Sequence, residues 1–367
     1  MKKVMSALVA GYILLAGISL HARILTVSNN PDRPAQYAAV QAAIDAATAG
    51  DTIYVHGSQF LYPDFTVNKQ LVIIGAGYNS NNQFNLPTRV NYIYFFRDAG
   101  LQNGSNTVLT GFAIAGGIQI GGSSQSIDGL RIFRNTITNM YTYTGTAFAN
   151  NWTLYNNIIT GTIYGGSGSS TSPSSTNISF QNNIFSTGGI YGFSASSILI
   201  DHNVFTGANS LSYLYYATLT NNIFIRATGN LMSTTVNFNT FNKNISNLTT
   251  VGPSAPTNSF AGGTNTESGN LVAVDPQFEN VTDLNNYNNT FNYRLKVTSP
   301  GHNTGTDLTD LGIYGGAYPF PSGGAVGSGF DTSPLPPIPQ VTEVNIQNAT
   351  LQPGTQLNVQ VKAKVNN

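Results

Sequence analysis

An eight-residue phrase that returns at nearly regular intervals is the strongest constraint on the fold of this chain. Each copy places an asparagine three residues after one apolar residue and two residues before another. The asparagines of successive copies are separated by 22, 26, 20, 19 and 22 residues. A repeat of this length indicates that similar units stack on one another to form a solenoid. The clear copies span residues 130–137, 152–159, 178–185, 198–205 and 217–224, and a degraded copy covers 241–245.

Apolar and variable residues alternate within each copy, which is the pattern of a strand with one buried face. A unit of about 20 residues is too short for a strand with a crossover helix, which needs roughly 30. We therefore predict coils of short strands, each paired in parallel with the next coil at about 4.8 Å. The predicted core residues three before each asparagine are Ile132, Leu154, Phe180, Ile200, Leu219 and Phe241.

The repeated asparagine falls where the chain must turn between two strands. Asparagine tolerates left-handed backbone and bonds locally through its amide. Stacked from coil to coil, these amides are expected to form a ladder, which favours a structural role over a catalytic one. The predicted ladder comprises Asn135, Asn157, Asn183, Asn203, Asn222 and Asn244.

Three stretches of the chain resemble the right-handed parallel β-helix family, the pectin-lyase-like superfamily. They are an Ala-rich entry segment (39–77), the asparagine repeats, and an exit segment at 274–278, 293–296 and 310–316. The resemblance covers about residues 24–320 and implies that the exit segment forms the last coils. This fold hosts lyases, hydrolases, esterases and adhesins, so the resemblance implies an all-β solenoid and no particular activity.

The N-terminus has the features of a signal peptide over residues 1–22. Lys2 and Lys3 precede an apolar run, and Ala22 closes an acceptable cleavage site. A membrane anchor is the alternative, but the apolar run is near the lower length limit for spanning and no charged stop signal follows it. We expect a secreted or cell-surface protein with no membrane span after cleavage.

The rest of the chain divides into three parts. Residues 23–319 form the predicted β-helix, and a helix at 35–47 is expected to cover its open first coil. Residues 320–340 are a Gly- and Pro-rich linker. Residues 341–367 contain two alternating segments joined around Pro353 and Gly354, which predict a C-terminal β-hairpin.

Composition excludes several classes of function. Charged residues are only 8% of the chain and the net charge is zero, so the basic stripe of a nucleic-acid-binding protein is missing. The chain has no cysteine, which excludes disulfides and thiolate metal sites. The histidines lack the spacing of metal ligands, so we expect neither a metal nor another cofactor. The sequence does not define the oligomeric state.

Asp201 and His202 are the candidates for catalysis. With Ile200 and Asn203 they resemble a phrase found in pectate lyases, and His202 could act as a general base. The arginine-rich catalytic motif of those enzymes is missing, and acidic residues are not clustered along the chain. A structural role for His202 is therefore the preferred interpretation.

An outward column of side chains is the candidate for ligand binding. The residues two and four before each ladder asparagine should stack on one sheet face, with aromatic rings beside amides and hydroxyls, which suits sugar rings. We therefore favour a non-enzymatic, carbohydrate-binding protein; a polysaccharide lyase or glycoside hydrolase and a structural or adhesive surface protein are the alternatives. The aromatic cluster at 213–216 is the second choice of site. The predicted glycan contacts are Arg131, Phe133, Tyr155, Gln181 and Asp201.

Overall fold

The computed structural model describes residues 22–77, 86–122, 125–145, 147–166, 168–195, 197–208, 210–320, 339–346 and 357–365. The predicted signal peptide and linker therefore lie outside the described residues, apart from their ends. In the described ranges, no helix has the length and apolar character needed to cross a membrane.

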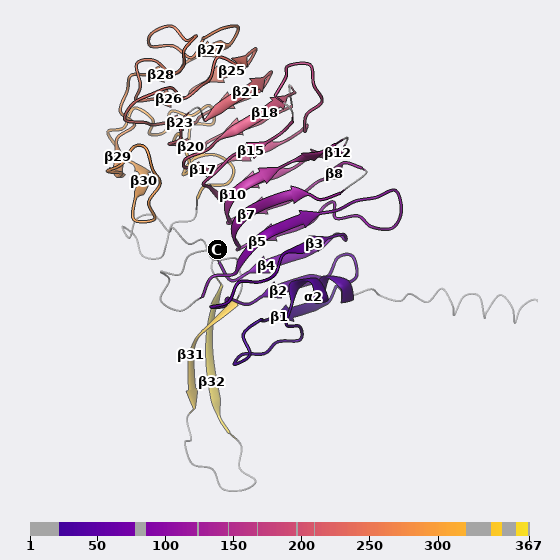
Figure 1. Ribbon diagram of the computed structural model, residues 1–367. Helices are drawn as coiled ribbons and strands as arrows, with labels where there is room; N and C mark the ends of the chain where they lie inside the picture. Colours follow the sequence, from indigo (N-terminus) through magenta and orange to yellow (C-terminus); the bar gives the residue numbers. More distant parts are fainter. Residues whose placement is uncertain are drawn as a thin grey trace, which may run out of the picture.

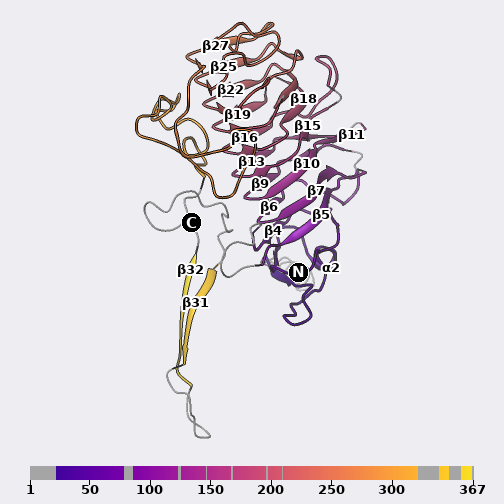
Figure 2. The same ribbon diagram turned by 60° about the vertical axis from the view of Figure 1, so that its left-hand side comes forward.

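Short parallel strands stack coil upon coil, so the predicted β-helix is confirmed (Figure 1). Within the described residues, the first sheet has 11 strands, one from each coil, and Figure 2 shows them running up one side of the solenoid. Neighbouring coils pair in register, for example Leu154 with Ile132 and with Phe180. The strands are β1 (Ile24–Val27), β2 (Thr52–Val55), β4 (Val72–Gly75), β6 (Val108–Thr110), β9 (Arg131–Phe133), β13 (Thr153–Tyr155), β16 (Ser179–Gln181), β19 (Leu199–Asp201), β22 (Thr218–Thr220), β25 (Thr240–Asn242) and β27 (Thr266–Ser268).

The second sheet changes shape along the solenoid. In the early coils it consists of continuous strands, β3 (Phe65–Val67), β5 (Arg89–Phe95), β7 (Ala113–Ile120) and β10 (Thr136–Tyr141). After β10 most coils contribute two short strands separated by a bend. The first halves are β14 (Ile158–Ile159), β17 (Ile184–Phe185), β20 (Val204–Phe205), β23 (Ile223–Phe224), β26 (Ile245–Ser246) and β28 (Leu271–Val272); the second halves are β15 (Ile163–Tyr164), β18 (Ile190–Ser194), β21 (Leu211–Tyr215) and β24 (Val236–Asn237).

Smaller sheets complete the described strands. β8 (Ile127–Asp128), β12 (Ala147–Asn150) and β11 (Tyr143–Thr144) form a three-stranded sheet. The predicted C-terminal hairpin is also present, because β31 (Pro339–Ile346) pairs antiparallel with β32 (Val359–Val365).

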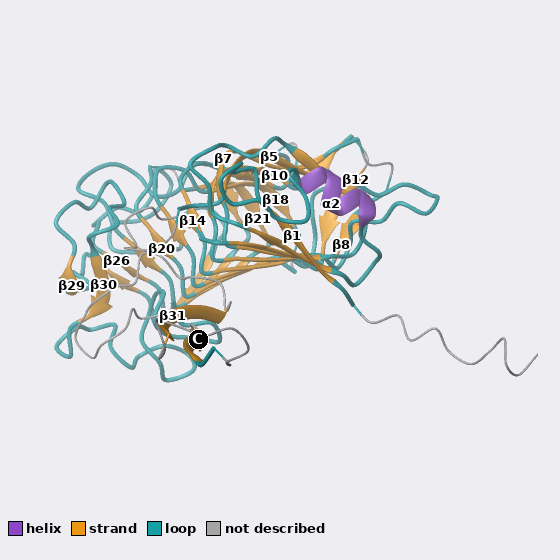
Figure 3. Cartoon of the chain, turned by 90° about the horizontal axis from the view of Figure 1, so that it is seen from below, coloured by secondary structure: helices purple, strands orange, loops and turns teal. Residues whose placement is uncertain are grey.

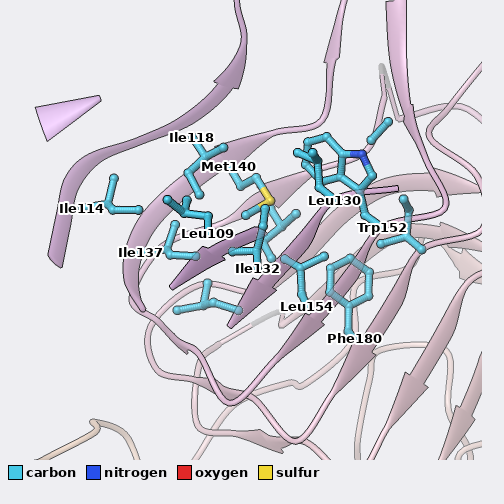
Figure 4. Packing of buried hydrophobic residues seen from close by; sticks show 14 of the residues in the cluster. Leu109, Ile114, Ile118, Leu130, Ile132, Ile137, Met140, Trp152, Leu154 and Phe180 are labelled. Atoms are coloured by element: carbon cyan, nitrogen blue, oxygen red, sulfur yellow. The ribbon is translucent and has the colours of Figure 1, made fainter. Parts of the chain in front are cut away.

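The interior of the solenoid is filled by columns of apolar side chains. Figure 4 shows Ile132, Leu154 and Phe180 from successive coils pointing into this core. Higher up, the rings of Phe185 and Phe205 stack at 4.5 Å, and Phe224 continues the stack at 4.7 Å. The repeated phrase therefore builds the core by placing equivalent side chains directly above one another.

Helix α2 (Val40–Ala46) lies at the N-terminal end of the solenoid (Figure 3), where it packs on β1, β2 and β3. It buries Val40, Ala43 and Ile44. The helix is shorter than the predicted 35–47, because Tyr37 forms a parallel bridge with Val27 and holds the preceding residues extended. The helix nevertheless covers the apolar interior at this end of the solenoid, as expected.

A buried carboxylate fixes the chain beside this helix. Asp51 is fully buried and accepts hydrogen bonds from the main-chain and guanidinium N–H groups of Arg23 and from the amide and hydroxyl of Thr48. Burial opposes its ionisation, but these hydrogen bonds outweigh that cost and lower the pKa of Asp51 well below its ordinary value.

We predict that Asp51→Asn lowers the free energy of unfolding by about 2 kcal/mol at neutral pH, because charge-assisted hydrogen bonds are lost. A lowered folded-state pKa stabilises the fold above the unfolded pKa of about 4, and this contribution is lost as the pH falls. Denaturant titrations at pH 7 and pH 3 should therefore show the difference between the two proteins shrinking in acid. A difference that stays constant would contradict the prediction.

The exit segment does not form the last coils, so this expectation was wrong. The last parallel strand described is β28, and β29 (Phe278–Asn280) pairs antiparallel with β30 (Asn292–Leu295). Residues 274–320, here called the C-terminal cover, instead fold back along the outside of the second sheet. Their buried side chains form a second apolar cluster, which includes Tyr293, Leu311, Ile313 and Phe320.

The C-terminal cover folds back along the solenoid because the outer face of the upper coils carries an apolar stripe. In the upper coils the residue directly after each ladder asparagine is apolar and points outward, opposite to the core residue that follows it. Such a stripe is stable only when something covers it. The stripe comprises Ile158, Ile184, Val204, Ile223 and Ile245, all of which are buried.

Candidate functional site: aromatic columns on the outer faces

The predicted ladder asparagines lie in one continuous hydrogen-bonded column. Each Nδ2 donates to the Oδ1 of the next asparagine at 2.9–3.2 Å, and each main-chain N–H donates to the same oxygen. The six predicted members are buried, and Asn270 is a seventh that the sequence pattern did not reveal. A second, shorter column consists of Asn239 and Asn265, which are bonded in the same way. With their amides engaged in this way, these side chains have a structural role.

We predicted that the ladder asparagine itself has the left-handed backbone of this turn. In the structure the residue before it has that conformation instead. Arg134, Asn156, Asn182, His202, Asn221 and Lys243 have φ between 52° and 58°. The ladder asparagine points inward from the turn, and the left-handed residue before it bends the chain from the first sheet into the second. The side chains of Asn156, Asn182, His202 and Asn221 consequently point outward to the C-terminal cover.

The predicted glycan column is in register on the first sheet. Tyr155 pairs with Phe133 on one side and with Gln181 on the other, and Gln181 pairs with Asp201. The rings of Phe133 and Tyr155 stack at 4.6 Å with an interplanar angle of 8°. The Arg131 guanidinium donates to the Tyr155 hydroxyl at 3.2 Å. The structure therefore brings these five residues together.

The glycan-binding prediction required an exposed Tyr155 ring, but this residue is buried. Its residue exposure is only 8%, because the Tyr318 ring of the C-terminal cover stacks on it at 4.3 Å. Asp201 is also engaged, since its Oδ1 accepts hydrogen bonds from Thr220 and Asn221. The cover therefore closes the middle of the predicted glycan column, which corrects the expectation of an open platform there.

His202 lies beneath the cover with only 1% of its side chain exposed. Its Nδ1 is 2.9 Å from Asp201 Oδ2, without the alignment of a hydrogen bond, and its Nε2 is 3.3 Å from the Thr309 hydroxyl. The ring packs so closely on Gly316 that a Cβ there would lie 2.7 Å from Nδ1. His202 therefore holds the cover in place and offers no open face to a substrate.

Asp307 of the cover lies on the other side of this imidazole, with Oδ1 3.6 Å from Nε2. Burial opposes ionisation of Asp307, but hydrogen bonds from Thr309 and the nearby His202 ring outweigh it and lower the pKa of Asp307. Across the described ranges, no group of three histidine or acidic side chains is arranged to hold a metal ion.

A second aromatic column, on the outer face of the second sheet, was missed by the sequence prediction. Tyr94, Gln119, Tyr141, Tyr164 and Tyr191 occupy register positions on five successive coils. The rings of Tyr141 and Tyr164 stack at 4.9 Å, and Tyr191 tilts away from Tyr164 by 59° at 5.5 Å. We call these residues together with Tyr92 the tyrosine column. All six are partly exposed.

Two of its rings lie over glycines of the adjacent coil. A Cβ on Gly116 would meet the Tyr92 ring at 2.5 Å, and a Cβ on Gly121 would meet the Tyr94 ring at 2.9 Å. The Tyr92 and Tyr94 rings also stack on each other at 6.0 Å, and both residues stay partly exposed. A tilted or flat ring with a free face is the geometry that stacks on a sugar ring.

The part of the tyrosine column formed by Tyr141, Tyr164 and Tyr191 comes from an uncharged stretch of the chain, whereas Tyr92 and Tyr94 lie near the Asp64 carboxylate. The sequence has no Asp, Glu, Lys or Arg between Arg134 and Asp201, a stretch that supplies three of the tyrosines. Burial, followed by repulsion from neighbouring phenols, raises the pKa of Tyr141 and of Tyr191. These two phenols therefore stay neutral at physiological pH, and the hydroxyl groups of the column offer hydrogen-bond donors and acceptors between the rings.

The sequence hides this column because its distance from the ladder varies. Tyr141, Tyr164 and Tyr191 follow their ladder asparagines by 6, 7 and 8 residues. The bend between the two halves of the second sheet absorbs the extra residues, so the tyrosines come into register only in three dimensions. A search at a fixed offset from the asparagine, as used for the first sheet, cannot find them.

No family model matches this chain. The search of curated proteins likewise finds no match. The functional conclusions below therefore rest on the geometry of the described residues.

Proposed function

We propose that this chain is a secreted, pectin-lyase-like β-helix protein that binds an uncharged polysaccharide along its tyrosine column without cleaving it. The observation that carries the proposal is the in-register series of partly exposed tyrosines. Four coil steps separate Tyr94 from Tyr191, which is about 19 Å at the spacing of paired strands. Such a column offers several ring faces and hydroxyls to an extended glycan.

The absence of charge along this part of the sequence favours a neutral glycan over an acidic one. A polyuronate carries one carboxylate per sugar, and its recognition relies on arginine or lysine. The side chains around Tyr141, Tyr164 and Tyr191 offer only phenols, amides, hydroxyls and backbone groups. Aromatic rings with amphipathic edges suit the apolar face and polar rim of a neutral sugar.

Binding is favoured over catalysis by the position of the only acidic–histidine pair singled out in the sequence. Asp201 and His202 lie beneath the C-terminal cover and take part in holding it. A lyase or hydrolase of this fold remains the alternative class. Release of reducing or unsaturated sugar by the intact protein, with or without calcium, would favour it.

We predict that Tyr164→Ala weakens glycan binding about tenfold, because loss of one stacking ring costs roughly 1–1.5 kcal/mol. Affinity electrophoresis in gels containing hydroxyethyl cellulose, galactomannan or laminarin would measure this, with polygalacturonate and alginate as acidic comparisons. We expect retardation in at least one neutral gel and none in the acidic gels.

Tyr54→Ala is the matched control. Tyr54 is an outward, half-buried tyrosine on β2 of the first sheet, so its loss should leave retardation unchanged. Equal effects of the two substitutions would place the binding surface elsewhere. The absence of retardation in every neutral gel would overturn the proposed function.

A further inference from the structure

Three aromatic residues near the end of the tyrosine column have a backbone conformation that their side chains disfavour. Within the described ranges, Tyr213, Tyr216 and Phe238 are the tyrosines and phenylalanines with positive φ, at 48°, 62° and 62°. The left-handed region is costly for bulky L-residues and is normally filled by glycine or asparagine. Strain of this kind persists where the side chain serves a purpose other than folding.

The other coils show which residues this backbone prefers. Tyr216 and Phe238 each lie two residues before a strand of the first sheet. The same position in five earlier coils is left-handed and holds Gly50, Asn106, Gly129, Asn151 and Asn177. Tyr213 similarly lies in register with Gly192, whose φ is 77°. Aromatic residues therefore replace residues that suit the turn.

Burial does not compensate for this strain at the turn. Tyr216 is 43% exposed and Phe238 is 49% exposed, although both are large and apolar. Their rings stack on each other at 5.3 Å with an interplanar angle of 14°. The pair forms an aromatic platform at the corner between the second and first sheets, and its cost in strain and exposure is not offset by core packing.

The surroundings of the platform have the same chemistry as the tyrosine column. Tyr213, three residues before Tyr216 in the chain, lies against Tyr191 of the column, with 4.9 Å between the ring centroids. Threonine hydroxyls border the corner, since Phe238 N–H donates to Thr264 Oγ1 at 3.0 Å. Residues 203–225 and 227–242 contain no Asp, Glu, Lys or Arg. A charged partner would find no complementary group in these segments.

We infer that Tyr216 and Phe238 form a second sugar-binding platform, which takes rings of the same uncharged polysaccharide where it passes the corner of the solenoid. The inference rests on the proposed function, because the tyrosine column supplies the first contacts. The strain is retained because the left-handed backbone aims both rings away from the core and toward solvent.

The Tyr216→Asn, Phe238→Asn double variant tests this inference with two opposite readouts. Asparagine suits the left-handed backbone, so the melting midpoint should rise by roughly 1–3 °C. Loss of the platform should weaken retardation in the neutral gel that binds the parent protein by about five- to tenfold. Asn177→Gly is the matched control at the equivalent turn of another coil and should leave binding unchanged.

The outcomes separate the two proposals. A lower melting midpoint would show that the rings stabilise the fold, and would overturn the inference. Unchanged binding by the double variant, with binding weakened by Tyr164→Ala, would remove the second platform and leave the tyrosine column in place. A parent protein that binds none of the neutral glycans would overturn both.

Discussion

Asn203→Ala should lower the free energy of unfolding by about 3 kcal/mol. The Asn203 Oδ1 accepts hydrogen bonds from both the main-chain N–H and the Nδ2 of Asn183, and its own Nδ2 donates to the Phe180 and Asp201 carbonyls. All of these groups are inside the solenoid, where water does not replace a lost partner. Each buried polar group left unpaired costs roughly 1–3 kcal/mol. Denaturant unfolding of the two proteins would measure the difference.

Asn242→Ala is the matched control for the ladder. Asn242 lies on the outer face of β25, two residues before a ladder asparagine, so the same atoms are removed at a partly exposed position. Its effect should be within about 0.5 kcal/mol. Similar losses for Asn203 and Asn242 would mean that the amide column is not a main source of stability.

Ile313→Asp should lower the free energy of unfolding by about 3–5 kcal/mol. The substitution places an unpaired charge in the buried contact between the C-terminal cover and the apolar stripe. Ile313 is buried beside the outward residues of several coils. We expect either a large fall in the melting midpoint or release of the cover. Limited proteolysis with mass spectrometry would distinguish them, since a released cover is cut within residues 274–320 while the coils stay resistant.

Ala317→Asp introduces the same charge into the same segment at an exposed position. It should leave both the melting midpoint and the cleavage pattern unchanged. If Ile313→Asp behaved like this control, the cover would contribute little to the stability of the upper coils.

The coils could be predicted because they depend on local repetition. A core residue such as Leu154 meets its equivalents Ile132 and Phe180 in the adjacent coils, so one copy of the phrase predicts the environment of the next. The identity of the inward and outward positions on the first sheet also followed from alternation alone.

The features that could not be predicted involve distant or variable parts of the chain. The stacking of Tyr318 on Tyr155 joins residues separated by more than a hundred positions, and no repeat encodes it. The tyrosine column depends on bends of different length. The outward apolar residues after the asparagines, such as Ile184 and Ile223, were nevertheless visible in the sequence. Two consecutive apolar residues cannot both point inward from a strand, so a covering segment could have been expected.

The C-terminal cover also changes how the number of coils can vary. In most repeat proteins each unit contacts only its neighbours, so units can be gained or lost individually. Here one short segment contacts several coils at fixed points. Tyr318 accepts a hydrogen bond from Asn156, Gly315 accepts one from Asn182, and Thr306 bonds with Asn221.

Deleting or duplicating a single coil in this region would move these contact points by about 4.8 Å relative to one another. The cover, whose length is fixed, could then meet only some of them. The segment that shields the apolar stripe therefore also limits the number of coils that the solenoid can have between Asn156 and Asn221. Variation in solenoid length is expected in the early coils, which lie outside its reach.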